Sequence, residues 1–160
     1  TAACLLTPTA LTNGAAMILP TVGGGATAAL DTTAACREAN HGIGLRLSWD
    51  APGYGDWQIN WAGARGRTVD LSEFRDVALS VKPTRGTEVV YLTLKDATGA
   101  QSEPTRLPMA QAPPGRWRTI TLPVRTFGSV DLSAVRSIDL TWNPGQADGS
   151  RLCVDGIGFR

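Results

Sequence analysis

The sequence lacks the features that mark a nucleic-acid-binding or membrane-spanning protein. Its 15 Lys and Arg against 14 Asp and Glu give a net charge of +1, whereas a phosphate-binding surface needs a basic excess. No apolar run is long enough to cross a bilayer. The apolar residues 1–30 are interrupted by prolines and glycines and follow no charged segment, so they are not an intact signal peptide. We therefore expect no nucleic-acid partner, no transmembrane segment and, if the protein is exported, a signal already removed.

Residues suited to catalysis are scarce as well. His41 is the only histidine, and the segment 40–42 around it is typical of a turn with no nucleophile motif beside it. Paired carboxylates can hydrolyse glycosides, but the aspartates here lie next to Gly, Pro or Ser, where turn formation explains them. No glycine-rich segment is followed by the Lys and Ser or Thr of a phosphate-binding loop. The sequence therefore predicts a protein that is not an enzyme.

The chain has only three cysteines, Cys4, Cys36 and Cys153, which leaves at least one unpaired within the chain. Their spacing matches no zinc motif. Cys4 and Cys36 lie in an irregular N-terminal part, where a covalent link is most useful, and Cys153 lies in an alternating segment that suits a small buried thiol. The sequence alone does not determine the connectivity, and we predict a disulfide between Cys4 and Cys36.

Helical periodicity is absent, and the second half of the chain alternates apolar and polar residues instead. Strands of this kind have one buried face and one solvated face. Short alternating segments separated by Gly, Pro and Asp clusters are typical of two packed antiparallel sheets. The alternating segments are 77–82, 90–95, 117–122, 138–142 and 152–155. We therefore predict an all-β fold, a two-sheet antiparallel β-sandwich, with short helical turns only near 72–74 and 133–135.

The 160 residues predict a single β-sandwich domain. Residues 1–41 are rich in Ala, Thr and Gly and weakly patterned. We expect them to form an irregular segment, with one short strand at 17–19, that packs on or beside the sandwich and covers an edge strand. The pattern sharpens from residue 42, so residues 42–160 are the expected core of the domain.

Several turn and core segments from residue 42 onward occur in an order that resembles a known family. They are Val69 to Phe74, Leu94 to Gly99, Gly115 to Pro123 and Val154 to Phe159. This layout resembles the galactose-binding-like jelly roll of carbohydrate-binding modules, in particular the family 11 type, and the complex I intermediate-associated protein 30 domain. The resemblance implies a jelly-roll fold. Because the matching residues are turn and core residues, they indicate the fold and not a ligand.

Aromatic side chains are few, at 6% of the chain, but they give the best indication of function. Sugars stack their apolar C–H faces on aromatic rings, and their hydroxyls bond to amides, carboxylates and Arg. The residues that we predict to bind carbohydrate in this way are Tyr54, Trp57, Gln58, Asn60, Tyr91 and Arg46. Trp57 shares its strand parity with Ile59, so a core position is its alternative. The other tryptophans, Trp49, Trp61, Trp117 and Trp142, fit the core periodicity.

Jelly rolls like the one this chain resembles commonly hold a structural calcium ion. The resemblance implies a calcium ligand at Asp155 in the closing segment, and Asp31, the only acid before Glu38, is its candidate partner. Calcium takes about six to eight oxygen ligands, many of which backbone carbonyls can supply. The alternative for Asp155 is a carboxylate that caps a turn.

Two functions of different classes follow. The first is a non-catalytic carbohydrate-binding module that binds a polysaccharide or glycan and is secreted, periplasmic or on the cell surface. The alternative is a structural or interaction subunit, with protein partners, of a larger extracytoplasmic or membrane-associated protein complex. Few aromatics and an apolar N-terminal segment favour the alternative. An open groove over the polar side of the Tyr91 strand would favour the first.

Overall fold

The computed structural model describes residues 3–4, 17–23, 27–31, 36, 38, 44–50, 54–60, 68–143 and 148–160, and before residue 36 it describes the backbone alone. The strands are β1 (Ala3–Cys4), β2 (Met17–Gly23), β3 (Thr27–Asp31), β4 (Gly44–Ser48), β5 (Tyr54–Asn60), β6 (Asp76–Pro83), β7 (Val90–Asp96), β8 (Thr105–Arg106), β9 (Arg118–Pro123), β10 (Val135–Trp142) and β11 (Arg151–Phe159). Short 3-10 helices lie at η1 (Met109–Gln111), η2 (Val124–Phe127) and η3 (Leu132–Ala134). The described residues include no α-helix, and none of their helices is long and apolar enough to span a membrane.

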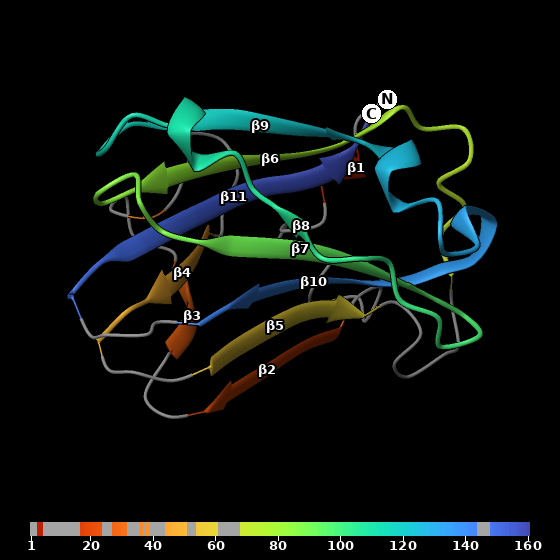
Figure 1. Ribbon diagram of the computed structural model, residues 1–160, viewed down its shortest axis with the longest axis horizontal. Helices are drawn as coiled ribbons and strands as arrows, with labels where there is room; N and C mark the ends of the chain where they lie inside the picture. Colours follow the sequence, from red (N-terminus) through yellow and green to blue (C-terminus); the bar gives the residue numbers. More distant parts are fainter. Residues whose placement is uncertain are drawn as a thin grey trace.

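The strands form two antiparallel sheets that pack face to face. The six-stranded sheet has the order β3-β4-β11-β6-β9, with β1 beside the end of β11, and the five-stranded sheet has the order β2-β5-β10-β7-β8. Figure 1 shows β9, β6 and β11 above, and β7, β10, β5 and β2 below. Neighbouring strands are mostly far apart in sequence, as in a jelly roll. The predicted all-β sandwich is therefore confirmed.

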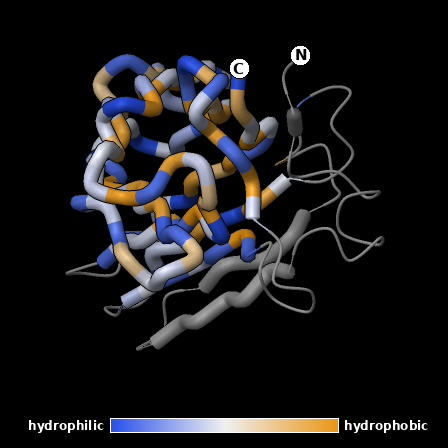
Figure 2. Tube along the Cα trace, turned by 90° about the vertical axis from the view of Figure 1, so that its right-hand side faces the viewer, coloured by the Kyte–Doolittle hydropathy of each residue, from blue (hydrophilic) through white to orange (hydrophobic). Residues whose placement is uncertain are grey.

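The core lies between the sheets and is built by the alternation seen in the sequence. On β7, Val90, Leu92 and Leu94 are fully buried, whereas Tyr91 between them is 36% exposed. Apolar and polar residues alternate along the tube in Figure 2 for the same reason. Each buried Leu, Ile or Val contributes about 1.5–3 kcal/mol relative to an exposed one. The same inward positions elsewhere hold Leu45, Leu47, Ile59, Leu79, Val81, Ile138, Leu140, Leu152 and Val154.

The tryptophans divide between the core and the surface. Trp49 and Trp142 are buried as predicted, with ring centroids 6.3 Å apart. Trp117 was predicted to be buried, but it is only half-buried, and Lys82 Nζ lies 5.3 Å from its ring centroid. The parity of the next strand explains the error: Ile120 is buried on β9, so the odd positions before it face outward. Trp61 lies outside the described residues.

The N-terminal part contributes more strands than the sequence predicted. The strand expected at 17–19 extends to Gly23 as β2 and pairs with β5 along its whole length. β3 pairs with β4, and β1 pairs with β11, although neither segment shows clear alternation. A strand can form on an existing sheet edge because that edge supplies unpaired N–H and C=O groups. The helical turn expected near 133–135 is η3, where Asp131 accepts a hydrogen bond from the Ser133 amide.

The disulfide joins Cys36 to Cys153, with an S–S distance of 2.06 Å, so the predicted Cys4–Cys36 bond is wrong. Cys153 lies on β11 at an outward position, between buried Leu152 and Val154. Two residues further along β11, Asp155 accepts the Glu38 amide at 2.8 Å, which holds the segment around residue 36 against this strand. Sequence position alone could not reveal this pairing, because it depends on which strand the N-terminal segment crosses.

Candidate functional site

The outward side of the five-stranded sheet carries a set of polar groups together with the two exposed tyrosines, Tyr54 and Tyr91. β5, β10 and β7 turn their apolar residues into the core, so their alternate residues share the opposite face. We call this set the polar face. It consists of Tyr54, Asp56, Gln58, Asn60, Ser137, Asp139, Thr141, Tyr91, Thr93, Lys95 and Arg106.

The strand register sets these side chains in rows across the sheet. One row runs through Asp56, Thr141, Tyr91 and Arg106, from β5 to β8. Tyr54 lies two positions before Asp56 on β5. Tyr54 is 50% exposed and Tyr91 is 36% exposed, and they are the large apolar or aromatic residues that remain exposed among those described. Two strand spacings and two residues along the strand separate their Cα atoms by roughly 12 Å.

A buried hydrogen-bond network forms the floor beside this row. Lys95 Nζ lies 2.8 Å from Asp139 Oδ2, and the Asp139 side chain is 3% exposed. Gln58 donates to the same oxygen at 3.3 Å, and Ser137 donates to Asp139 Oδ1 at 3.0 Å. Asn60 in turn donates to the Gln58 carbonyl oxygen at 3.1 Å. Because these bonds fix several side chains in place, the floor is organised before any ligand arrives.

Asp56 stands apart from this network. Its side chain is half-buried, and its Oδ1 atom is buried without a hydrogen-bond partner. Burial raises the pKa of Asp56, and the nearby Asp139 charge raises it further, against a smaller opposing effect of Lys95. Burial, together with the charges of Asp56 and Asp139, also raises the pKa of Tyr54. An unpartnered carboxylate between two exposed rings is a ready acceptor for ligand hydroxyl groups.

The structure brings together four of the predicted carbohydrate-binding residues, namely Tyr54, Gln58, Asn60 and Tyr91. Two predictions need correction. Trp57 is only 1% exposed and packs in the core, so its ring offers no stacking surface. Arg46 is exposed, but it lies on β4 opposite Cys153, on the outer side of the other sheet.

The prediction missed Asp56, Asp139, Lys95 and Arg106. Asp56 could have been found, because it falls between Tyr54 and Gln58 with the same strand parity. The other three come from strands whose neighbours in the sheet are not evident from the sequence.

Asp155, the predicted calcium ligand, is fully buried and bound to backbone amides. Its carboxylate accepts the Glu38 amide at 2.8 Å and the Gly156 amide at 2.7 Å. These bonds fit the capping alternative, and the described residues hold no group of three or more His, Cys, Asp or Glu side chains suited to a metal. The Asp31 side chain lies outside the described atoms, so calcium at Asp155 and Asp31 stays a prediction.

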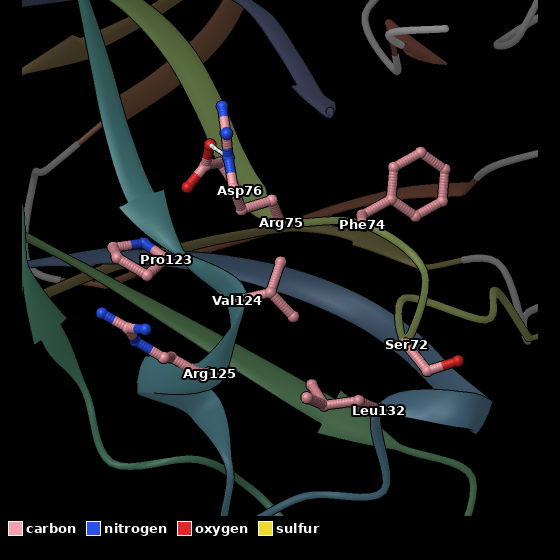
Figure 3. Close-up of a pocket in the computed structure, with 8 residues that line it drawn as sticks. All are labelled: Ser72, Phe74, Arg75, Asp76, Pro123, Val124, Arg125 and Leu132. Atoms are coloured by element: carbon pink, nitrogen blue, oxygen red, sulfur yellow. Dashed lines mark hydrogen bonds and ion pairs between the residues drawn. The ribbon is translucent and has the colours of Figure 1, made fainter.

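Two hollows elsewhere are less suited to a sugar. One, of about 350 Å³, lies between the start of β6 and the end of β9, where Figure 3 shows Val124 and Leu132 beside an ion pair. In that pair Arg75 Nε lies 3.0 Å from Asp76 Oδ2, so both charges are compensated. Another hollow, of about 400 Å³, lies beyond β8 and is lined by Arg106, Thr87 and Glu88 together with apolar residues that include Leu107. It adjoins the polar face at one end.

Comparison with known proteins supports the fold. No protein-family model matches the chain, and no curated protein matches it. Among solved structures, the chain is similar to the family 11 carbohydrate-binding module of the cellulosomal cellulase Lic26A-Cel5E of Clostridium thermocellum. The TM-score is 0.66 at 16% identity, over 99% of this chain and 94% of that one.

Two further structures agree. A family 11 module from Clostridium thermocellum, in complex with a β-1,3-1,4-mixed-linked tetrasaccharide, gives a TM-score of 0.61 at 17% identity over 89% of this chain and 87% of that one. A family 30 carbohydrate-binding module gives a TM-score of 0.57 at 19% identity over 83% of this chain and 73% of that one. The fold is therefore the galactose-binding-like jelly roll found in carbohydrate-binding modules. The resemblance to the complex I domain stays a prediction.

Proposed function

We propose that this protein is a non-catalytic carbohydrate-binding module and that its polar face holds the glycan. One observation carries the proposal: exposed Tyr54 and Tyr91 flank an unpartnered carboxylate on a sheet face whose floor is already hydrogen-bonded. Tyrosine rings stack on sugar C–H faces, while Asp56 accepts hydroxyl hydrogens and Arg106 donates to hydroxyl oxygens. The two tyrosine Cα atoms lie roughly 12 Å apart, so a ligand that contacts both rings must be extended, which favours an oligosaccharide over a single sugar.

The arrangement favours binding over catalysis. Asp139 is held by Lys95, Gln58 and Ser137, so this carboxylate is committed to the floor and is not free to transfer a proton. Asp56 then remains without a second free carboxylate on the polar face, whereas glycoside hydrolysis uses a pair. A face with one acceptor and two stacking rings suits reversible binding.

An extracytoplasmic location is part of the proposal. The Cys36–Cys153 disulfide supports it, because structural disulfides persist in oxidising compartments and are rare in the cytosol. We propose that the protein acts after secretion, in the periplasm or at the cell surface.

A binding panel tests the function. The purified protein is titrated calorimetrically with mixed-linked β-1,3-1,4-glucan, β-1,2-glucan, agarose oligosaccharides and α-L-arabinofuranosides. These are chosen because similar folds occur in proteins bound to such sugars or named for acting on them. We expect saturable binding to at least one, with loss of binding when Tyr54 and Tyr91 are both changed to Ala. Absence of binding to the whole panel and to a broader glycan array would contradict the proposal and favour the alternative, a subunit of a protein complex.

A further inference from the structure

Asp56 occupies a central place on the polar face. It lies on β5 between the positions of Thr21 on β2 and Thr141 on β10. Its side-chain Oδ1 atom is buried and has no hydrogen-bond partner among the described residues. This oxygen of the carboxylate therefore lacks the protein donors that normally stabilise a buried negative charge.

The charged groups around Asp56 are already occupied or lie further away. On its own strand the titratable neighbour is Tyr54, and β2, Met17–Gly23, carries no titratable residue. On β10 the nearest is Asp139, which binds Lys95 of β7 at 2.8 Å. The remaining charged or titratable groups in the same row are Tyr91 on β7 and Arg106 on β8, two and three strands away. Lys95, the cation whose charge acts on Asp56, is thus already paired with another carboxylate.

We propose that Asp56 makes glycan binding depend on pH: the polar face binds its glycan when Asp56 is ionised and releases it when Asp56 takes up a proton. The inference rests on the proposed function of the polar face. It adds to that function the ionisation state in which the face binds and the residue that sets it.

The direction follows from linkage. Hydroxyl hydrogens donated by a sugar stabilise the carboxylate, so a bound glycan lowers the pKa of Asp56. Burial and Asp139 raise that pKa in the free protein, so protonation begins above the ordinary aspartate range. Affinity is then full above the pKa of the free protein and falls as pH drops through it. The fall approaches about tenfold per pH unit between the free and bound values, because one proton competes with the glycan.

The test is a set of calorimetric titrations of the whole chain from about pH 8 to about pH 4, across the ordinary range of histidine and carboxyl groups. The probe is the glycan of the panel that binds most tightly, and circular dichroism at each pH verifies that the protein stays folded. Asp56→Asn is the test variant. Asp50→Asn is the matched control, because Asp50 is an exposed aspartate that pairs with Arg151 at 2.7 Å on the other sheet. Carboxyl-carbon NMR of Asp56, with and without glycan, reports its pKa directly.

We expect the parent protein and Asp50→Asn to lose affinity in acid, and Asp56→Asn to bind more weakly at pH 8 with little further change. We also expect glycan to shift the Asp56 titration to lower pH. Binding that is constant with pH in the folded parent protein overturns this inference and leaves the proposed function intact. A loss of affinity in acid that persists in Asp56→Asn also overturns this inference and leaves the proposed function intact, because the loss would then come from another group such as His41. Absence of binding at every pH overturns both.

Discussion

At the residue scale, exposure distinguishes two aromatic residues that the sequence analysis had both predicted to bind carbohydrate. Tyr91 and Trp57 both belong to strands of the five-stranded sheet. Tyr91 is 36% exposed, whereas Trp57 is 1% exposed. Strand parity explains the difference, since Tyr91 alternates with buried leucines and Trp57 aligns with buried Ile59. The two rings therefore face in opposite directions, Tyr91 toward solvent and Trp57 toward the core.

Replacing these two rings separates binding from folding. Tyr91→Ala should weaken glycan binding by on the order of 1 kcal/mol, about fivefold in Kd, with little change in Tm, because the ring leaves no internal cavity. Trp57→Ala should lower the free energy of unfolding by about 3–5 kcal/mol through a core cavity. Calorimetric titration and urea unfolding of both variants give the comparison. An equal loss of stability in the two would show that the face assignment is wrong.

Ionised Asp56 should lower the stability of the folded protein. Its pKa is raised in the folded protein, so ionisation opposes folding, and stability falls as pH rises from the ordinary aspartate pKa through the folded one. Asp56→Asn removes this loss. Because the side chain is half-exposed and solvent screens the charge, we expect a gain of no more than about 0.5 kcal/mol near neutral pH and none in acid. Thermal melts at several pH values test this, and an Asn variant less stable than the parent near neutral pH would refute it.

At the element scale, β11 organises the six-stranded sheet. It pairs with β4 on one side and β6 on the other, and its end pairs with β1. The N-terminal segment is tied to the same strand through the disulfide and through Asp155. β11 therefore connects the two ends of the chain covalently and by hydrogen bonds, and Figure 1 shows β1 beside its end.

Loss of the disulfide should destabilise the whole domain. The bond links residues separated by 117 positions, and closing a loop near that length stabilises by about 4–5 kcal/mol in the chain-entropy model. We expect the double variant Cys36→Ser, Cys153→Ser to lose about 3–5 kcal/mol in guanidinium unfolding. A Cys4→Ser variant is the matched control and should lose far less. Peptide mapping without reductant should recover the Cys36 and Cys153 peptides joined, and a Cys4–Cys36 peptide would contradict the assignment.

At the scale of the whole molecule, a structural ion would act on global stability. The calcium prediction from sequence requires Tm to rise with millimolar calcium and to fall with chelator, in the parent protein but not in Asp155→Asn. The carboxylate of Asp155 also accepts hydrogen bonds from two backbone amides. We therefore expect Asp155→Asn to be less stable than the parent protein even in the presence of chelator, because the substitution weakens a buried acceptor of two N–H groups. A Tm of the parent protein that ignores calcium would leave capping as the sole role of Asp155.

The exposure of the polar face bears on both the carbohydrate-binding hypothesis and its alternative, a subunit of a protein complex. Tyr54 and Tyr91 are exposed on the polar face, whereas Thr93, Ser137 and Asp139 of the same face are buried. An open groove over the Tyr91 strand, which would favour carbohydrate binding, stays a prediction. The low number of exposed aromatics, which favoured a protein partner, counts less when both rings lie on the same face.

The sequence alone was enough to predict the fold class and many inward and outward positions. Alternation with a period of two is local, so it can be read on each strand without knowing the strand's neighbours, and Leu92 and Leu94 were correctly placed in the core. The same parity placed Tyr91 outward and could have placed Asp56 beside Tyr54. It failed for Trp117 because the residue precedes β9 on the outward parity.

The tertiary structure alone decided which strands are neighbours. Lys95 and Asp139 are 44 positions apart in sequence, yet they form an ion pair because β7 and β10 pair in the five-stranded sheet. The pairing of strands also explains two other outcomes. Cys36 bonds to Cys153 on β11, and Arg46 lies far from the tyrosines because β4 belongs, with β11, to the other sheet. Strand order and register depend on how all the buried faces pack at once. A short segment of sequence does not contain the strand order or register, so the site could be recognised only in the assembled sheets.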